Sequence, residues 1–262
     1  MSEVVTRSIQ DGVAVLTLNR PDRLNAWTAE MKRTYFDLLE DCAASSNVQV
    51  VVLTGAGRGF CAGADMDELR AIGDGGMAEA AAREDPRAQT FPLTIPKPII
   101  AAINGPCAGL GLVHALMCDL RFAAAEAKIT TAFSRRGLIA EHGISWILPR
   151  VVGPSRALDL LFSSRIVLAE EAAELGLVNR VVEPDRLMEE TLDYARDLAT
   201  NCAPSSMATM KGQIYADLER GLTEALGTAN ELMVESFTKP DFAEGVASFM
   251  EKREPNFEPV GS

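Results

Sequence analysis

Histidine, cysteine and aromatic residues are scarce in this chain of 262 residues, which has two histidines, five cysteines and 6% aromatic residues. The cysteines are odd in number and form no Cys-x-x-Cys pair, so we expect neither a disulfide scaffold nor a metal site. Basic residues are outnumbered 25 to 37, and the net charge of −12 disfavours nucleic-acid and anionic-membrane partners. An anionic ligand would need a local cluster of Arg and Lys.

Three common catalytic motifs are also missing: the Walker A sequence, the Gly-x-Ser-x-Gly elbow and His-Glu-x-x-His. A dinucleotide fingerprint beginning at Gly55 is incomplete, because Phe60 stands where the third glycine should be. The first residues carry Glu3 and no apolar stretch, unlike a secretory signal peptide. Together with the unpatterned cysteines, this favours a reducing compartment, and we expect a cytoplasmic protein.

The stretch from Pro98 to Cys118 has no charged residue and is long enough to raise the question of a membrane span. Asn104-Gly105-Pro106 interrupts it, and Gly109 and Gly111 follow. We therefore interpret it as a buried strand, a tight turn and a buried helix, and we expect no membrane partner.

Apolar runs typical of strands alternate with helical patterns over the first ~180 residues, as in α/β proteins. The predicted strands cover residues 4–9, 13–18, 48–54, 99–103, 120–124 and 129–131, and a helix of about four turns starts at Thr28. From residue 184 onward the pattern predicts four helices and no strand. We therefore predict an α/β core, residues 1–183, and a helical region, residues 184–262, packed on it. Residues 73–87 have weak periodicity, typical of a mobile helix or a loop.

Two glycine-rich turns each follow a strong predicted strand: Phe60–Met66 and Asn104–Gly111. Small residues allow main-chain N–H groups to approach a ligand, so together the two turns could form an oxyanion hole. The alternative is that they are tight turns packed against their neighbours.

Motifs along nearly the whole chain resemble the crotonase (enoyl-CoA hydratase/isomerase) superfamily. They are Asn19-Arg20-Pro21 with Leu24-Asn25-Ala26, Gly59 to Asp65, Ala102 to Gly105 with Cys118-Asp119, Leu148-Pro149-Arg150, Glu170 to Val178 and Phe249 to Pro255. The resemblance implies a crotonase-like α/β spiral of ββα units with a helical C-terminal trimerisation region, assembled as a homotrimer or a dimer of trimers. It also implies an acyl-coenzyme A thioester as substrate, with no tightly bound cofactor.

The resemblance further implies that the thioester carbonyl lies between the main-chain N–H groups of Ala64 and Leu110. Leu110 replaces a glycine that the family often has, and its side chain would narrow the acyl pocket. The residues matched to coenzyme binding are Arg23, Leu24, Ala26, Arg58, Ala62, Asp65 and Met66, with Lys252, beside Arg253, contributed by another subunit. The alternatives are that the cations are ordinary surface residues and that Asp65 caps a helix.

Hydratases of this family carry two glutamates, and the matching positions here are Val113 and Phe133. Neither side chain can activate water, so two-glutamate hydration is not expected. The remaining carboxylate is Glu141, which matches the single acid of several isomerase members. Its neighbours Leu138, Ile139 and Ala140 would reduce its hydration, as suits a base that must return its proton. Alternatively, Glu141 is a helix-start carboxylate near residues 143–152.

His142 could assist Glu141, although side chains of adjacent residues usually point apart, and we expect His114 to be a core histidine with satisfied hydrogen bonds. The resulting hypothesis is double-bond isomerisation of an enoyl-CoA by one carboxylate. Two alternatives stay open: an enoyl-CoA hydratase in which Glu141 positions water, and a noncatalytic acyl-CoA binding protein.

Overall fold

A computed structural model of the protein describes residues 3–71, 76 and 85–260. Most of the segment 73–87, predicted to be a mobile helix or a loop, lies outside the described residues. Among the described residues, no helix combines the length and apolar character that crossing a membrane requires.

The centre of the chain is a six-stranded sheet in the order β1-β2-β3-β4-β6-β9. The first two strands form an antiparallel hairpin, and every later neighbour is parallel. Asp11 and Gly12 join the hairpin, both with positive φ, as a two-residue turn of this kind requires. The strands are β1 Val5–Gln10, β2 Val13–Leu18, β3 Val50–Gly55, β4 Ile99–Ile103, β6 Leu120–Ala124 and β9 Arg180–Val182.

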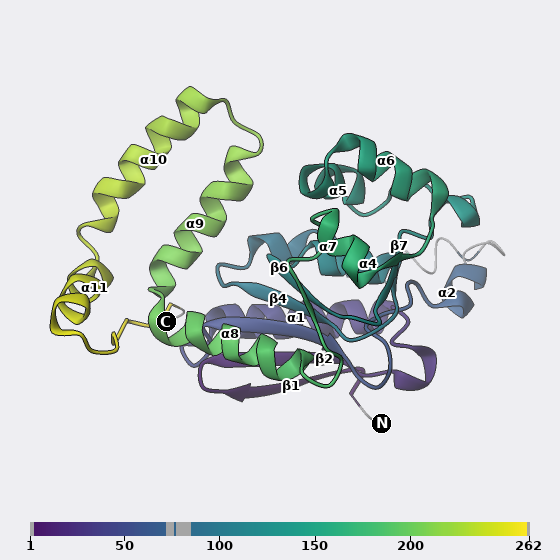
Figure 1. Ribbon diagram of the computed structural model, residues 1–262, viewed down its shortest axis with the longest axis horizontal. Helices are drawn as coiled ribbons and strands as arrows, with labels where there is room; N and C mark the ends of the chain where they lie inside the picture. Colours follow the sequence, from purple (N-terminus) through teal and green to yellow (C-terminus); the bar gives the residue numbers. More distant parts are fainter. Residues whose placement is uncertain (1–2, 72–75, 77–84, 261–262) are drawn as a thin grey trace.

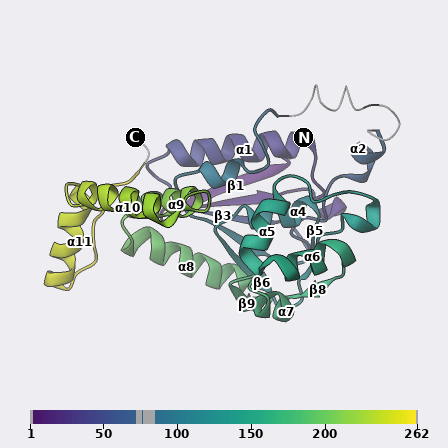
Figure 2. The ribbon, with the colours of Figure 1, turned by 90° about the horizontal axis from the view of Figure 1, so that it is seen from above.

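Helices cover both faces of this sheet, which explains the nearly continuous apolar runs of β3 and β4. Helix α1, Ala29–Ala44, packs on one face through residues that include Tyr35, Phe36 and Leu39. Helix α8, Leu187–Asn201, covers the other face in a second apolar cluster with Val52 and Ile100. Figure 2 shows the strands between α1 and α8. The region 184–262 therefore contributes its first helix directly to the core.

A second, smaller sheet lies beside the first, in the order β5-β7-β8. Its strands are β5 Cys107–Ala108, β7 Lys128–Thr130 and β8 Val167–Leu168. The uncharged stretch from Pro98 to Cys118 contains the predicted buried strand, β4, and the predicted buried helix, α4 Leu110–Leu116, and the connection between them also includes the short strand β5. The remaining short elements of this part are η1 Pro21–Arg23, α2 Met66–Ala71, η3 Phe91–Thr94, η4 Ser134–Arg136, α5 Ile144–Val152, α6 Pro154–Ser163 and α7 Ala169–Glu174.

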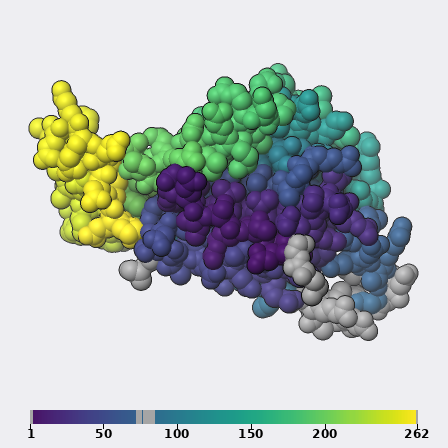
Figure 3. Space-filling view, turned by 90° about the horizontal axis from the view of Figure 1, so that it is seen from below, coloured from purple at the N-terminus to yellow at the C-terminus, as the bar shows by residue number. Residues whose placement is uncertain are grey.

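Three further helices extend away from the sheets at one end of the molecule (Figures 1 and 3). They are α9 Pro204–Asp217, α10 Leu222–Ser236 and α11 Pro240–Glu251. An ion pair attaches α9 to the core, since the Lys211 Nζ lies 2.8 Å from Asp119 Oδ2 and also donates to the Lys97 carbonyl. The alternating α/β part and the helical end agree with the fold class predicted from the sequence.

Candidate active site

The two glycine-rich turns lie against each other at the ends of β3 and β4. Their chains form a parallel bridge between Cys61 and Cys107, and the Ala108 N–H donates to the Cys61 carbonyl at 2.9 Å. A Cβ placed on Gly63 would lie 3.1 Å from the Ala108 carbonyl oxygen and 3.9 Å from the Gly109 Cα. Gly63 and Gly109 also have φ of +103° and +50°, a region that side chains disfavour. Glycine is thus needed where the turns touch.

Two asparagine side chains, the buried Asn25 and the half-buried Asn104, bind the segment that leads into the first glycine turn. Asn25 is fully buried and donates from Nδ2 to the Gly59 and Ala56 carbonyls, while its Oδ1 accepts from the Arg20 N–H at 2.8 Å. Asn104 spans from the end of β4 to β3, donating at 2.8 Å to the Gly55 carbonyl and accepting from the same residue's N–H. These bonds hold the loops in register, and the two asparagines belong to the motifs predicted to matter.

The residues directly after Gly63 and Gly109 are Ala64 and Leu110, and their N–H groups donate no hydrogen bond within the part of the chain that the structure describes. For Leu110 this follows from its place as the first residue of α4, where a helix leaves N–H groups unpaired. Two such donors on touching turns are suited to a carbonyl oxygen that gains charge.

The loop that precedes α1 packs on the first glycine turn. The Leu24 carbonyl accepts from the Ala62 N–H at 3.0 Å, and Gly57 and Gly59, on either side of Arg58, approach Pro21 and Leu24. The structure therefore brings the predicted coenzyme residues of this loop together with Arg58. Arg23 and Arg58 are exposed, and Ala26 is half-buried.

Three further predicted residues lie where the glycine turn leads into α2. Ala62 is half-buried, and Met66 is 50% exposed as the first residue of α2. Asp65 is 5% exposed, accepts from the Asp67 N–H at 3.0 Å and pairs with Arg20 at 2.9 Å. Burial raises the pKa of Asp65, but the Asp67 N–H and Arg20 outweigh it and the pKa falls below its usual value. This carboxylate caps α2, which was the alternative to a ligand contact.

Lys252 is separated from the other predicted coenzyme residues within one chain. It is exposed and follows α11, whereas α2 lies at the opposite end of the molecule (Figure 1). Its neighbour Arg253 is engaged by Glu244 and Glu251. The chain by itself does not bring Lys252 to the glycine turns.

The positions that match the hydratase glutamates are apolar and buried in the main core. Val113 is 0% exposed and Phe133 is 5% exposed, and both belong to the same apolar cluster. Cys61 lies in the first glycine turn, but burial raises the pKa of its thiol to about 12, so it stays protonated and is a poor nucleophile.

Glu141 lies in the connection from β7 to α5. This connection starts beside the second glycine turn, where the Gly109 N–H donates to the Thr130 carbonyl, and α5 packs on α4. The Glu141 side chain is 32% exposed, and Ile139, expected to shield it, is 76% exposed, so the single chain leaves this carboxylate partly open. Gly143, rather than Glu141, is the N-cap residue of α5, and no side chain caps that helix.

His142 faces Glu141, with 3.4 Å between its Nε2 and Glu141 Oε2. The expectation that adjacent side chains point apart was therefore wrong here. The reason is the backbone, because His142 has φ of +57° and turns its side chain toward its neighbour.

His114 is fully buried on α4, as predicted, but its hydrogen bonds are not satisfied. Neither ring nitrogen has a partner among the described residues. Its ring stacks on Trp27, with centroids 3.7 Å apart and planes at 24°. Trp27 was missed in the sequence, although it directly follows the Leu24-Asn25-Ala26 motif.

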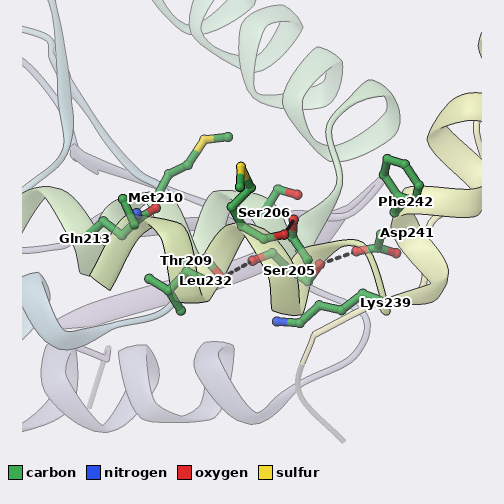
Figure 4. A pocket seen from close by; sticks show the side chains of 12 residues that line it. Ser205, Ser206, Thr209, Met210, Gln213, Leu232, Lys239, Asp241 and Phe242 are labelled. Atoms are coloured by element: carbon green, nitrogen blue, oxygen red, sulfur yellow. Dashed lines mark hydrogen bonds between the residues drawn. The ribbon is translucent and has the colours of Figure 1, made fainter. Parts of the chain in front are cut away.

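A cavity of about 540 Å³ is lined by Lys32, residues 85–90 and the two residues that follow Glu141 in the chain, His142 and Gly143. A cavity of about 310 Å³ lies between α9, α10 and α11 (Figure 4), at the other end of the molecule from α2. The residues that the structure describes contain no cluster of His, Cys, Asp and Glu suited to a metal ion.

The chain is similar to known proteins along nearly its whole length. The family model for enoyl-CoA hydratase/isomerase matches residues 8–259. The 1,2-epoxyphenylacetyl-CoA isomerase of Escherichia coli is 36% identical over 98% of this chain and 99% of its own. The solved enoyl-CoA hydratase of Bacillus anthracis superimposes with a TM-score of 0.91 at 30% identity, covering 99% of this chain and 100% of its own.

A second solved structure, an enoyl-CoA hydratase from Mycobacterium marinum, is 49% identical and has a TM-score of 0.72, over 84% of this chain and 100% of its own. These relatives carry both isomerase and hydratase names and cover 84% to 99% of this chain. The chain belongs to the enoyl-CoA hydratase/isomerase family of enzymes, the crotonase superfamily.

Proposed function

We propose that the protein isomerises the double bond of an enoyl-CoA, with the Ala64 and Leu110 N–H groups as the oxyanion hole and Glu141 as the proton carrier. The observation that carries the proposal is the contact of the two glycine turns, each followed by an N–H without an acceptor among the described residues. Such donors stabilise the enolate oxygen of the transition state more than the ground-state carbonyl.

The step requires one carboxylate. Glu141 takes a proton from C2 of a 3-enoyl thioester, and the electrons of that C–H bond move onto the thioester oxygen as a dienolate. The same carboxyl returns the proton at C4, and the double bond then lies between C2 and C3. Hydration in the two-glutamate manner is disfavoured because Val113 and Phe133 are buried apolar residues.

The coenzyme is assigned to the surface beside the first glycine turn. Arg23 and Arg58 lie on adjacent loops in a protein with a net charge of −12, and Arg23 lies 3.5 Å from the exposed Asp67 carboxylate, so Arg58 supplies most of the local positive charge. The main chain at Leu24, Ala26 and Ala62 borders the same surface. Asp65 is kept in this assignment only as the residue that fixes Arg20 and α2. For Lys252 we propose a contribution across a subunit interface in a homotrimer or a dimer of trimers.

The test is an assay of the purified protein with 3-enoyl- and 2-enoyl-CoA, with products separated by chromatography and mass. We expect conversion between the two isomers without gain of water. Glu141→Gln should remove turnover while acyl-CoA still binds, and Glu174→Gln, an exposed carboxylate on α7, is the matched control. Water addition to 2-enoyl-CoA would instead establish the hydratase alternative, and binding without any turnover the noncatalytic one.

A further inference from the structure

We infer that the stack of Trp27 on His114 is a positioning clamp, which sets the separation of the Ala64 and Leu110 N–H groups through the shape of its rings. This inference rests on the proposed oxyanion hole. It concerns two buried side chains that the isomerisation chemistry does not use.

One half of the clamp is joined to the first donor by the main chain. The Trp27 N–H donates to the Gly63 carbonyl at 2.7 Å, and the Trp27 carbonyl accepts from the Asp65 N–H at 2.9 Å. These two bonds lie on either side of Ala64 and form a parallel bridge. A shift of Trp27 therefore moves Ala64 with it.

The other half is joined to the second donor through α4. His114 follows Leu110 by four residues, so both lie on the same face of this short helix. Tyr35 meets both rings of the stack edge-on, at 5.9 Å from Trp27 and 5.7 Å from His114. The stack thus connects the two donor segments by a second contact, in addition to the direct contact between Gly63 and the Ala108 and Gly109 main chain.

The His114 nitrogens do not explain why a histidine is packed here. Both lack a hydrogen-bond partner among the described residues, and burial lowers the pKa of His114 to about 3, so the ring is neutral at pH 7. The Trp27 Nε1 and the Tyr35 hydroxyl are also buried without partners among those residues. Trp27, Tyr35 and His114 all have flat rings in close contact, and stacking requires a flat ring.

The experiment compares His114→Phe, which keeps a flat ring, with His114→Leu and His114→Ala, which do not. We expect His114→Phe to keep kcat within about threefold and to raise Tm by about 2–4 °C, because two unpaired buried nitrogens are removed. We expect His114→Ala to lower kcat about 100-fold with little change in KM, the scale of a misplacement of about 1 Å. His114→Leu fills most of the volume of the histidine side chain, so its kcat should lie between those of His114→Phe and His114→Ala.

Two further measurements separate positioning from a general loss of stability. Phe122→Ala opens a cavity in the apolar cluster on the other face of the sheet and should lower Tm but not kcat. The infrared stretching frequency of the carbonyl group in a ¹³C=O-labelled saturated acyl-CoA measures hydrogen bonding from the two N–H donors without turnover. Its shift to lower frequency on binding should persist in His114→Phe and shrink in His114→Ala.

The outcomes are distinct. An equal loss of kcat in His114→Phe and His114→Ala would mean that the ring nitrogens act, and it would overturn the inference. Wild-type kcat and an unchanged carbonyl shift in His114→Ala and His114→Leu would overturn it too. A wild-type protein that shifts the carbonyl but converts no enoyl-CoA would contradict the proposed function and leave the clamp supported by the spectra.

Discussion

The contact between Gly63 and the second turn gives a quantitative test of the proposed oxyanion hole. In Gly63→Ala, the new Cβ would lie 3.1 Å from the Ala108 carbonyl oxygen and 3.6 Å from its carbon, at a residue with φ of +103°. Relief of this contact moves the turns apart by a few tenths of an ångström. The backbone strain costs about 1–3 kcal/mol of unfolding free energy.

The catalytic effect should be of the same order as the effect on stability. Removal of one oxyanion donor lowers kcat about 100- to 1,000-fold, and a shift of a few tenths of an ångström weakens a donor without removing it, so we expect kcat to fall about tenfold. The assay is steady-state turnover of enoyl-CoA, with Tm measured alongside. The matched control is Gly212→Ala on α9, where the Cβ meets open space and helix propensity improves by about 1 kcal/mol. A folded Gly63→Ala protein with wild-type kcat would refute the reasoning.

Three further predictions address the base, the coenzyme and the pH dependence of stability. Glu141→Gln should lower kcat about 100- to 10,000-fold with unchanged acyl-CoA affinity in calorimetry, and a mutant with normal kcat would exclude it as the proton carrier. Arg58→Ala should raise KM about tenfold with kcat unchanged, the value of one charge-assisted hydrogen bond to a phosphate, and a lower kcat at the same KM would contradict this role. The hydrogen bond from Arg87 lowers the pKa of Asp85 from 3.8 to about 2, so this carboxylate stabilises the fold above pH 4 and ceases to do so as pH falls toward 2. Asp85→Asn should therefore lower Tm at pH 7, and a Tm difference that persists at pH 2 would contradict the assignment.

The sequence predicted the main elements because their signals are local. Alternating and continuous apolar runs located β1, β2, β3, β4 and β6, which are five of the six strands of the main sheet. The strands β5, β8 and β9 have two or three residues each, and so short a run has no periodicity to detect. The role of α8 was likewise hidden, because an amphipathic helix does not reveal which surface it covers.

Some features of the candidate site could likewise be predicted from the sequence and others could not. The sequence suggested that the two glycine turns could act together because each follows a strong predicted strand, and the structure brings them into contact at Gly63 and Gly109. The pairing of Glu141 with His142 was not predicted, since it depends on a positive φ at His142. The stack of Trp27 on His114 joins residues 87 positions apart, and such contacts are fixed by tertiary packing. For Asp65, the plainer capping role fits the observed bonds.

A crystal structure with a bound nonreactive acyl-CoA tests the central claim most directly. The account predicts a thioester oxygen within about 2.7–3.1 Å of both the Ala64 and the Leu110 nitrogen, with the Glu141 carboxylate within hydrogen-bond reach of C2 or C4. A thioester oxygen bound away from both nitrogens, or a Glu141 carboxylate turned to bulk water, would contradict it.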